Sequence, residues 1–83
     1  MEILAGTILN YYREIGVARV KILDFLEVGD RIHIKGHTTD FEQEVESLQV
    51  GHVQVSASRS GEIAGLRVYE YVRKHDRVYR VED

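Results

Sequence analysis

The chain has 83 residues, and an apolar fraction of 43% is typical of a globular domain and too high for a disordered segment. Cysteine is absent, which excludes disulfides and thiol chemistry, and the net charge of −3 provides no general attraction for nucleic acid. No apolar run approaches about 18 residues, and no basic segment opens the chain, so we expect neither a membrane span nor a secretory signal. These observations predict a single domain over residues 1–83, located in the cytoplasm.

Short strands are predicted along the first third of the chain, because valine and tyrosine are frequent and no helical stripe of apolar residues is present. The first strand is expected at residues 2–11, with Gly6 as a bulge or a point of close packing. A loop at residues 12–16 leads to a second strand at residues 17–23, in which apolar and basic residues alternate.

The segment LEVGDRIHIKG, residues 26–36, combines a turn, a strand and a second turn. Gly29 and Asp30 suit the first turn, since glycine tolerates positive φ and aspartate bonds nearby backbone. Ile32 and Ile34 are expected to face inward, and Gly36 ends the strand.

The second half of the chain continues the strand pattern. The apolar phase changes within residues 41–50, which predicts a long strand with a β-bulge near residues 46–47. Residues 53–57 form either a short strand or an extended connection, and further strands are expected at 66–72 and 77–81. The acidic residues between positions 40 and 46 are interpreted as a solvated outer face rather than as a metal or substrate site.

Six or seven short strands predict an all-β fold, a small closed antiparallel β-barrel. The residues expected in its core are Ile3, Ile8, Val20, Ile22, Leu26, Ile32, Ile34, Val45, Leu48, Leu66, Val68 and Val78.

The segment LEVGDRIHIKG resembles the L-x-x-G-D-x-[apolar]-x-[apolar]-x-G signature of the second-domain barrel of translational GTPases of the elongation factor Tu type. Residues 6–8 (GTI) and 16–18 (GVA) are similar to the opening hairpin of that barrel. Residues 45–50 (VESLQV), the glycines Gly61 and Gly65 with the strand that follows, and Arg77-Val78 resemble its later strands. The pattern also resembles the C-terminal barrel of collagenase-like peptidase-family proteins, a family associated with tRNA hydroxylation.

Three features depart from the elongation-factor pattern. The phosphate loop G-x-x-x-x-G-K-[ST] is absent, so no bound nucleotide is expected. We expect no other cofactor either. The strand that receives the aminoacyl end of tRNA in elongation factors corresponds to a segment that carries Gln49, Gly51 and His52 in this chain. His75-Asp76 replaces the usual Gly-Asp before the last strand, which predicts a turn of another type, because a left-handed conformation costs more for histidine.

No catalytic or metal-binding spacing is recognisable. His33 and His37 are four residues apart but are separated by the end of a strand, so we interpret them as surface histidines and expect no metal. The serines lack a nucleophile-elbow context and no Ser-His-Asp pattern is present, which predicts that the chain is not an enzyme.

Basic and aromatic residues alternate near the C-terminus, on two strands expected to be neighbours. Stacking aromatic side chains flanked by cations are typical of single-stranded nucleic-acid binding, although Tyr and Arg also make good outward cross-strand pairs. A protein-docking surface is the third alternative. The residues of this predicted binding cluster are Arg67, Tyr69, Tyr71, Arg73, Lys74, Arg77, Tyr79 and Arg80.

Two functions follow from the sequence and the resemblance. The first is a non-catalytic binding module of translation or of tRNA-modifying machinery, which contacts tRNA, rRNA or a translation-related protein. The second is a protein-interaction module that docks onto a separately encoded enzyme, such as a peptidase-family-like protein, without contacting RNA.

Overall fold

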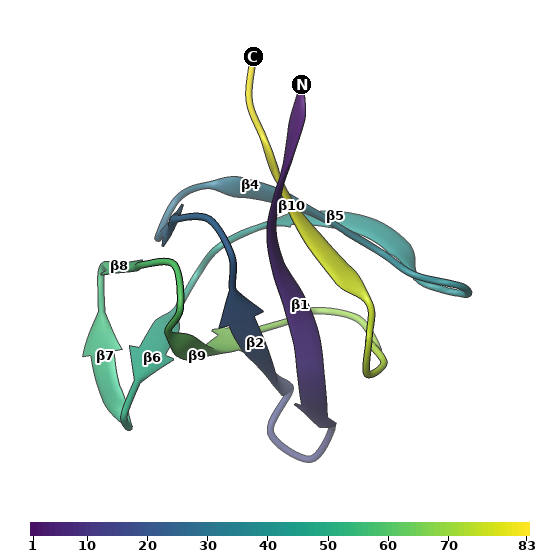
Figure 1. Ribbon diagram of the computed structural model, residues 1–83. Coiled ribbons are helices and arrows are strands. Elements are labelled where there is room, and N and C mark those ends of the chain that lie inside the picture. Colours follow the sequence, from purple (N-terminus) through teal and green to yellow (C-terminus); the bar gives the residue numbers. More distant parts are fainter.

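The computed structural model describes all 83 residues, which form ten strands and no helix (Figure 1). Eight strands make one antiparallel sheet in the order β5-β4-β10-β1-β2-β9-β6-β7, and two short strands, β3 and β8, form a separate pair. The strands of the large sheet are β1 (Glu2–Tyr12), β2 (Val17–Ile22), β4 (Arg31–Lys35), β5 (Asp40–Glu44), β6 (Leu48–Val50), β7 (Val53–Val55), β9 (Ile63–Arg67) and β10 (Arg77–Val81); the pair is β3 (Leu26–Glu27) with β8 (Ala57–Ser58). The structure contains no helix long and apolar enough to cross a membrane.

The prediction of an all-β fold is confirmed, but the prediction of a closed barrel is wrong. The sheet is open, with β5 at one edge and β7 at the other. β5 has no strand partner on its outer side, but the side chain of its residue Gln43 hydrogen-bonds to the backbone at and just after the end of β9. The Gln43 Nε2 donates to the Arg67 carbonyl at 2.9 Å, and the Gln43 Oε1 accepts from the Tyr69 amide at 2.9 Å. Gln43 is 3% exposed, so one buried amide side chain provides the contact that a strand ladder would provide in a closed barrel.

Two predicted strands have different limits in the structure. Residues 41–50 are not one bulged strand, because β5 ends at Glu44 and β6 begins at Leu48, and the two lie far apart in the strand order. The residues 45–47 between them carry the chain across the open side of the sheet. The strand expected at 66–72 corresponds to β9, which begins earlier and ends at Arg67, so Tyr69 and Tyr71 lie outside the sheet.

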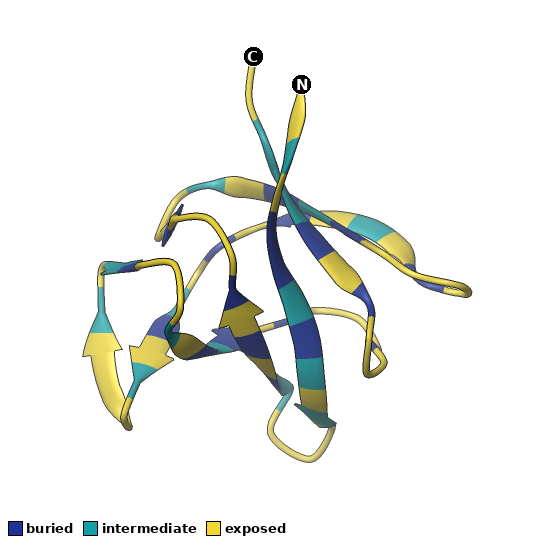
Figure 2. Cartoon of the chain, in the orientation of Figure 1, coloured by how far each residue is buried: buried dark blue, intermediate teal, exposed yellow.

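The core is where the sequence pattern places it. Every predicted core residue is buried except Ile3, which is half-buried, and the small core residues Ala5, Ala18 and Ala64 were not predicted. In β2, β4 and β9 the buried positions recur at alternate residues (Figure 2). The predicted irregularity at Gly6 is also present, because the β1–β10 register shifts between Leu4 and Gly6.

The segment of residues 26–36 folds as a turn, a strand and a second turn. Gly29 has a φ of 97°, and Asp30 Oδ2 accepts the Glu27 amide at 2.9 Å. Ile32 and Ile34 have no exposed surface. The strand of this segment, β4, lies between β5 and β10 in the sheet. Gly36 follows directly after β4, at the position where the candidate site begins.

Candidate anion-binding site

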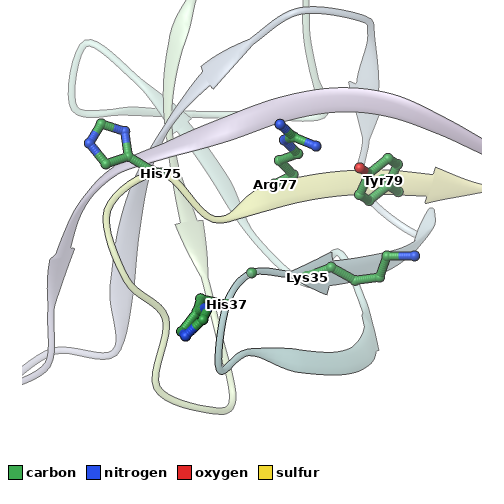
Figure 3. Close-up of a pocket in the computed structure, with 6 residues that line it drawn as sticks. Lys35, His37, His75, Arg77 and Tyr79 are labelled. Atoms are coloured by element: carbon green, nitrogen blue, oxygen red, sulfur yellow. The ribbon is translucent and has the colours of Figure 1, made fainter.

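A pocket of 430 Å³ lies where the end of β4 meets the start of β10. The two strands are antiparallel neighbours with Lys35 opposite Arg77, and each is joined here to a turn. Figure 3 shows Lys35, Arg77 and Tyr79 on the strands, with His37 and His75 on the two turns. Gly36 completes the lining.

The turn before β10 is fixed by Asp76, which is 4% exposed. Its Oδ2 accepts the Arg73 amide at 2.9 Å, and its own amide donates to the Arg73 carbonyl at 3.0 Å. His75 has a φ of 79°, in the left-handed region, so the predicted change of turn type is wrong. The His75 amide donates to the Ile8 carbonyl at 2.9 Å, which ties this residue to β1 and contributes to holding its unfavourable backbone conformation.

The position of Asp76 also explains why residue 36 is glycine. A Cβ atom at position 36 would lie well inside van der Waals contact of the Asp76 carboxylate. The two turns can therefore approach only because residue 36 has no side chain. This close approach places the imidazole of His37 and the imidazole of His75 at one pocket, although they are 38 residues apart in the sequence.

The lining of the pocket is basic. It contains two cations, Lys35 and Arg77, and two histidines, and no carboxylate. Arg77 takes part in none of the ion pairs of the structure, whereas Lys35 Nζ lies 3.6 Å from Glu2 and 5.2 Å from the centre of the Tyr79 ring. An arrangement of guanidinium, ammonium and imidazole groups around an open pocket is suited to an oxyanion such as a phosphate group.

The predicted binding cluster is only partly brought together. Arg77 and Tyr79 line the pocket, while Arg73 and Lys74 belong to the adjoining turn. Arg73 lies 4.9 Å from the centre of the Tyr71 ring, and Tyr71 packs edge-on against Tyr11 with ring centres 4.9 Å apart.

The remaining members of the cluster lie elsewhere, because β9 and β10 are separated in the sheet by β1 and β2 and are not neighbours as predicted. The Tyr69 hydroxyl donates to Glu46, which raises the pKa of that hydroxyl above its usual value. Arg80 is bound by carboxylates, with Glu82 at 2.7 Å and Asp24 at 3.3 Å, and its side chain is only 13% exposed. Arg67 lies at the end of β9.

Lys35, His37 and His75 were missed as site residues. The signal was available in part, since Lys35-Gly36-His37 and Lys74-His75-Asp76-Arg77 are similar basic turns flanking strands. Their proximity depends on the pairing of β4 with β10, which the pattern of a single sequence does not reveal.

Gln49, Gly51 and His52, predicted at a strand like that which receives the aminoacyl end of tRNA, lie at the other end of the sheet. Gln49 is on β6, and Gly51 and His52 form the two-residue turn to β7 with φ values of 59° and 65°. Positive φ at both central residues is typical of a tight hairpin turn. These residues line a second, separate groove. Gly61 occupies another turn with φ 93°, and Gly65 lies within β9.

His33 lies at the centre of a group of acidic side chains beside the pocket. Its Nδ1 is 2.6 Å from Glu2 and its Nε2 is 2.5 Å from Asp40, so the imidazolium form can donate to both carboxylates. The hydrogen bond to Asp40, then that to Glu2, raises the pKa of His33 above 6.5, and His33 in turn lowers the pKa of Glu2. Ligand atoms of Glu2, His33 and Glu42 lie within 4.8 Å of one another, which makes them the residues that could hold a metal ion.

Comparison with known proteins places this structure beside peptidase-family domains. The chain is 35% identical over 83 residues to an uncharacterized protease of Methanocaldococcus jannaschii, and the match spans 99% of this chain but only 20% of that protein's length. The C-terminal domain of a proposed U32 peptidase of Geobacillus thermoleovorans superimposes with a TM-score of 0.90 at 22% identity, covering 96% of this chain and 93% of that one. This chain therefore has the same fold as that Geobacillus domain. A selenomethionine variant of the same Geobacillus domain gives a TM-score of 0.86 at 23% identity, and no family model matches the chain.

The predicted resemblance to collagenase-like peptidase-family proteins is therefore confirmed. The resemblance to translation elongation factors receives no support from these relatives, none of which is a translation factor.

Proposed function

We propose that residues 1–83 form a non-catalytic domain of the U32-peptidase type, which docks onto the catalytic part of a peptidase-family protein. The observation that carries this proposal is the similarity over 99% of the chain to one fifth of a protease, together with the same fold in a U32-type C-terminal domain. The chain's own groups support a role other than catalysis. Cysteine is absent, and the hydrogen-bonded histidine His33 is engaged by carboxylates rather than by a serine or threonine.

A chimera tests the docking. The fifth of the M. jannaschii protease that matches this chain is replaced by residues 1–83, and thermal unfolding of the chimera is compared with that of the isolated chain by calorimetry. Docking stabilises the bound state of the domain, so its unfolding temperature should rise in the chimera. The unmodified protease and its own excised segment form the matched control pair. If the chain unfolds at the same temperature in both contexts while the control pair shows a rise, the docking proposal is wrong.

RNA contact is the second candidate, and the specific observation that favours it is the basic pocket. Arg77 is free of ion pairs, Lys35 and Tyr79 lie beside it, and Arg73 extends the positive charge along the adjoining turn. Cations combined with an aromatic ring suit a single strand, whose phosphates and bases need different partners. Because the net charge of the chain is negative, a basic surface that binds RNA must be local, as this pocket is.

Titration of the isolated chain with single-stranded RNA and with tRNA, at two salt concentrations, tests this candidate. Removing one cation that neutralises a phosphate should make the plot of log affinity against log salt less steep by about 0.7 for a single strand. Arg77→Gln should reduce both affinity and steepness, whereas Arg59→Gln, in a turn outside the pocket, should leave both unchanged. Equal effects of the two substitutions, or affinity that does not depend on salt, would exclude a phosphate site at this pocket. The cytoplasmic location stays a prediction.

A further inference from the structure

A groove of 600 Å³ lies at the other end of the sheet from the basic pocket. Its floor is the outer face of β2, β9 and β6, and its walls are the β1–β2 connection and the β6–β7 turn. Both walls are exposed segments (Figure 2). The groove shares no residue with the basic pocket.

Apolar side chains line this groove without being covered. Ile15 is 64% exposed, Tyr12 43% and Ile63 42%, and Val17 of β2 also lines the groove. An outward-facing strand position normally carries a polar residue, so a group of exposed aliphatic and aromatic side chains around one concave site is typical of an interaction surface.

The charge in the groove has one sign. Arg19 and His52 are its ionisable members besides Tyr12, and no carboxylate lines it. The Arg19 guanidinium donates to Asn10 Oδ1 at 2.9 Å, a neutral partner, so its charge is not balanced within the chain. A binding partner that brings apolar side chains together with one carboxylate would therefore complement the groove.

We infer that this groove is the face on which the domain docks to the catalytic part of its peptidase-type protein, with apolar side chains of that part against Ile15 and Ile63 and a carboxylate at Arg19. The inference rests on the proposed function. The occupant is chosen because four fifths of the M. jannaschii relative lies outside the matching segment and supplies a large protein surface. RNA suits this groove less well than the basic pocket, since five of the ten residues that line the groove are hydrophobic, against one of six in the pocket.

Hydroxyl-radical footprinting of the chimera described above tests the inference, with the isolated chain as reference. The labelling rates of Tyr12 and Ile15 should fall threefold or more in the chimera. Tyr71, which is 53% exposed, and Leu4, which is 39% exposed, lie outside the groove and should keep their rates. In a second variant, Ile15→Asp should abolish the protection of Tyr12 in the chimera, and Leu4→Asp should not.

The outcomes separate the inference from the proposed function. Protection of Tyr71 or Leu4 with no change at Tyr12 and Ile15 would retain docking and refute the groove as its site. No protection at any side chain would refute both. Protection at the groove that persists in Ile15→Asp would also overturn the inference, because taking a carboxylate out of water in place of an apolar side chain should prevent the apolar contact.

Discussion

Replacing Gly36 by alanine isolates the contact on which the basic pocket depends. Gly36 does not have positive φ, so alanine is compatible with its backbone, and a Gly→Ala change at such a position ordinarily stabilises a protein by about 0.4–1 kcal/mol through the unfolded state. Here the new methyl group would overlap the carboxylate of Asp76. We therefore expect the opposite sign, a loss of stability.

The magnitude follows from what Asp76 would have to give up. The carboxylate is buried and accepts the Arg73 amide, so moving it aside breaks that hydrogen bond or strains the turn. Overpacking costs about 1–3 kcal/mol, which includes the range expected when a buried hydrogen bond is broken. A domain of this length has a total stability of about 4–12 kcal/mol, so the effect is easily measured.

Urea unfolding followed by circular dichroism provides the assay, in a double-mutant cycle. Asp76→Ala alone should cost about 1–2 kcal/mol, because the Arg73 amide loses its acceptor. Adding Gly36→Ala to Asp76→Ala should then change stability by less than about 0.5 kcal/mol, since the clashing group is gone. Gly65→Ala is the matched control, because a Cβ there meets Val17 and Gln49 at ordinary distances of 3.5 Å and 3.8 Å. Additive effects of the two substitutions, or a stabilising Gly36→Ala, would refute the reasoning.

Three further predictions concern the core, the open side of the sheet and pH. Ile34→Ala should lower the free energy of unfolding by about 2–5 kcal/mol in the same urea assay, because Ile34 has no exposed surface; a loss below about 1 kcal/mol would contradict the packing. Gln43→Ala should lower the free energy of unfolding by about 1–3 kcal/mol, because the Tyr69 amide and the Arg67 carbonyl lose their hydrogen-bond partner. Hydrogen exchange of the Tyr69 amide, measured by NMR, should become faster. Unchanged exchange would contradict the hydrogen bond between Gln43 and this amide. The raised pKa of His33 contributes stability that is fully present below about pH 6.5 and is lost as pH rises through the pKa of the folded state. The melting temperature should therefore fall as pH rises above about 6.5 in the native chain, and less so in His33→Gln.

The core and the turns could be predicted from the sequence because both depend on local information. Alternation of apolar residues predicted the inward face of β2 and β4, and Gly29-Asp30 predicted a turn that the backbone adopts. The strand order could not be obtained in this way. The change of phase within residues 41–50 is equally compatible with a bulge and with a crossing from one strand to another. The pairing of Leu48 with Leu66 on β9 distinguishes the two.

Only two residues of the predicted cluster, Arg77 and Tyr79, line the basic pocket, because the rest of its lining depends on strand pairing. Arg77 and Tyr79 alternate on one strand, which sequence reveals, whereas Lys35 and His37 come from a turn that reaches them only through the β4–β10 pairing. The sequence pattern favoured β9 as the neighbour of β10 and so included Arg67 and Tyr69 in the cluster, although β1 and β2 lie between the two strands.

The separation of the two surfaces bears on how the two candidate functions relate. The groove is formed by β2, β9 and β6, and the pocket by β4, β10 and their turns, and they have no residue in common. A domain docked through Ile15 and Ile63 would therefore keep Arg77 accessible, so docking and binding of an oxyanion are compatible and can be measured independently.

Ile15→Asp changes only the groove and Arg77→Gln changes only the pocket, so each substitution is the control for the other. Ile15→Asp should leave RNA affinity unchanged, and Arg77→Gln should leave the unfolding temperature of the chimera unchanged. Cross-effects between the two would mean that the surfaces are coupled through β1, the strand that lies between β10 and β2 in the sheet.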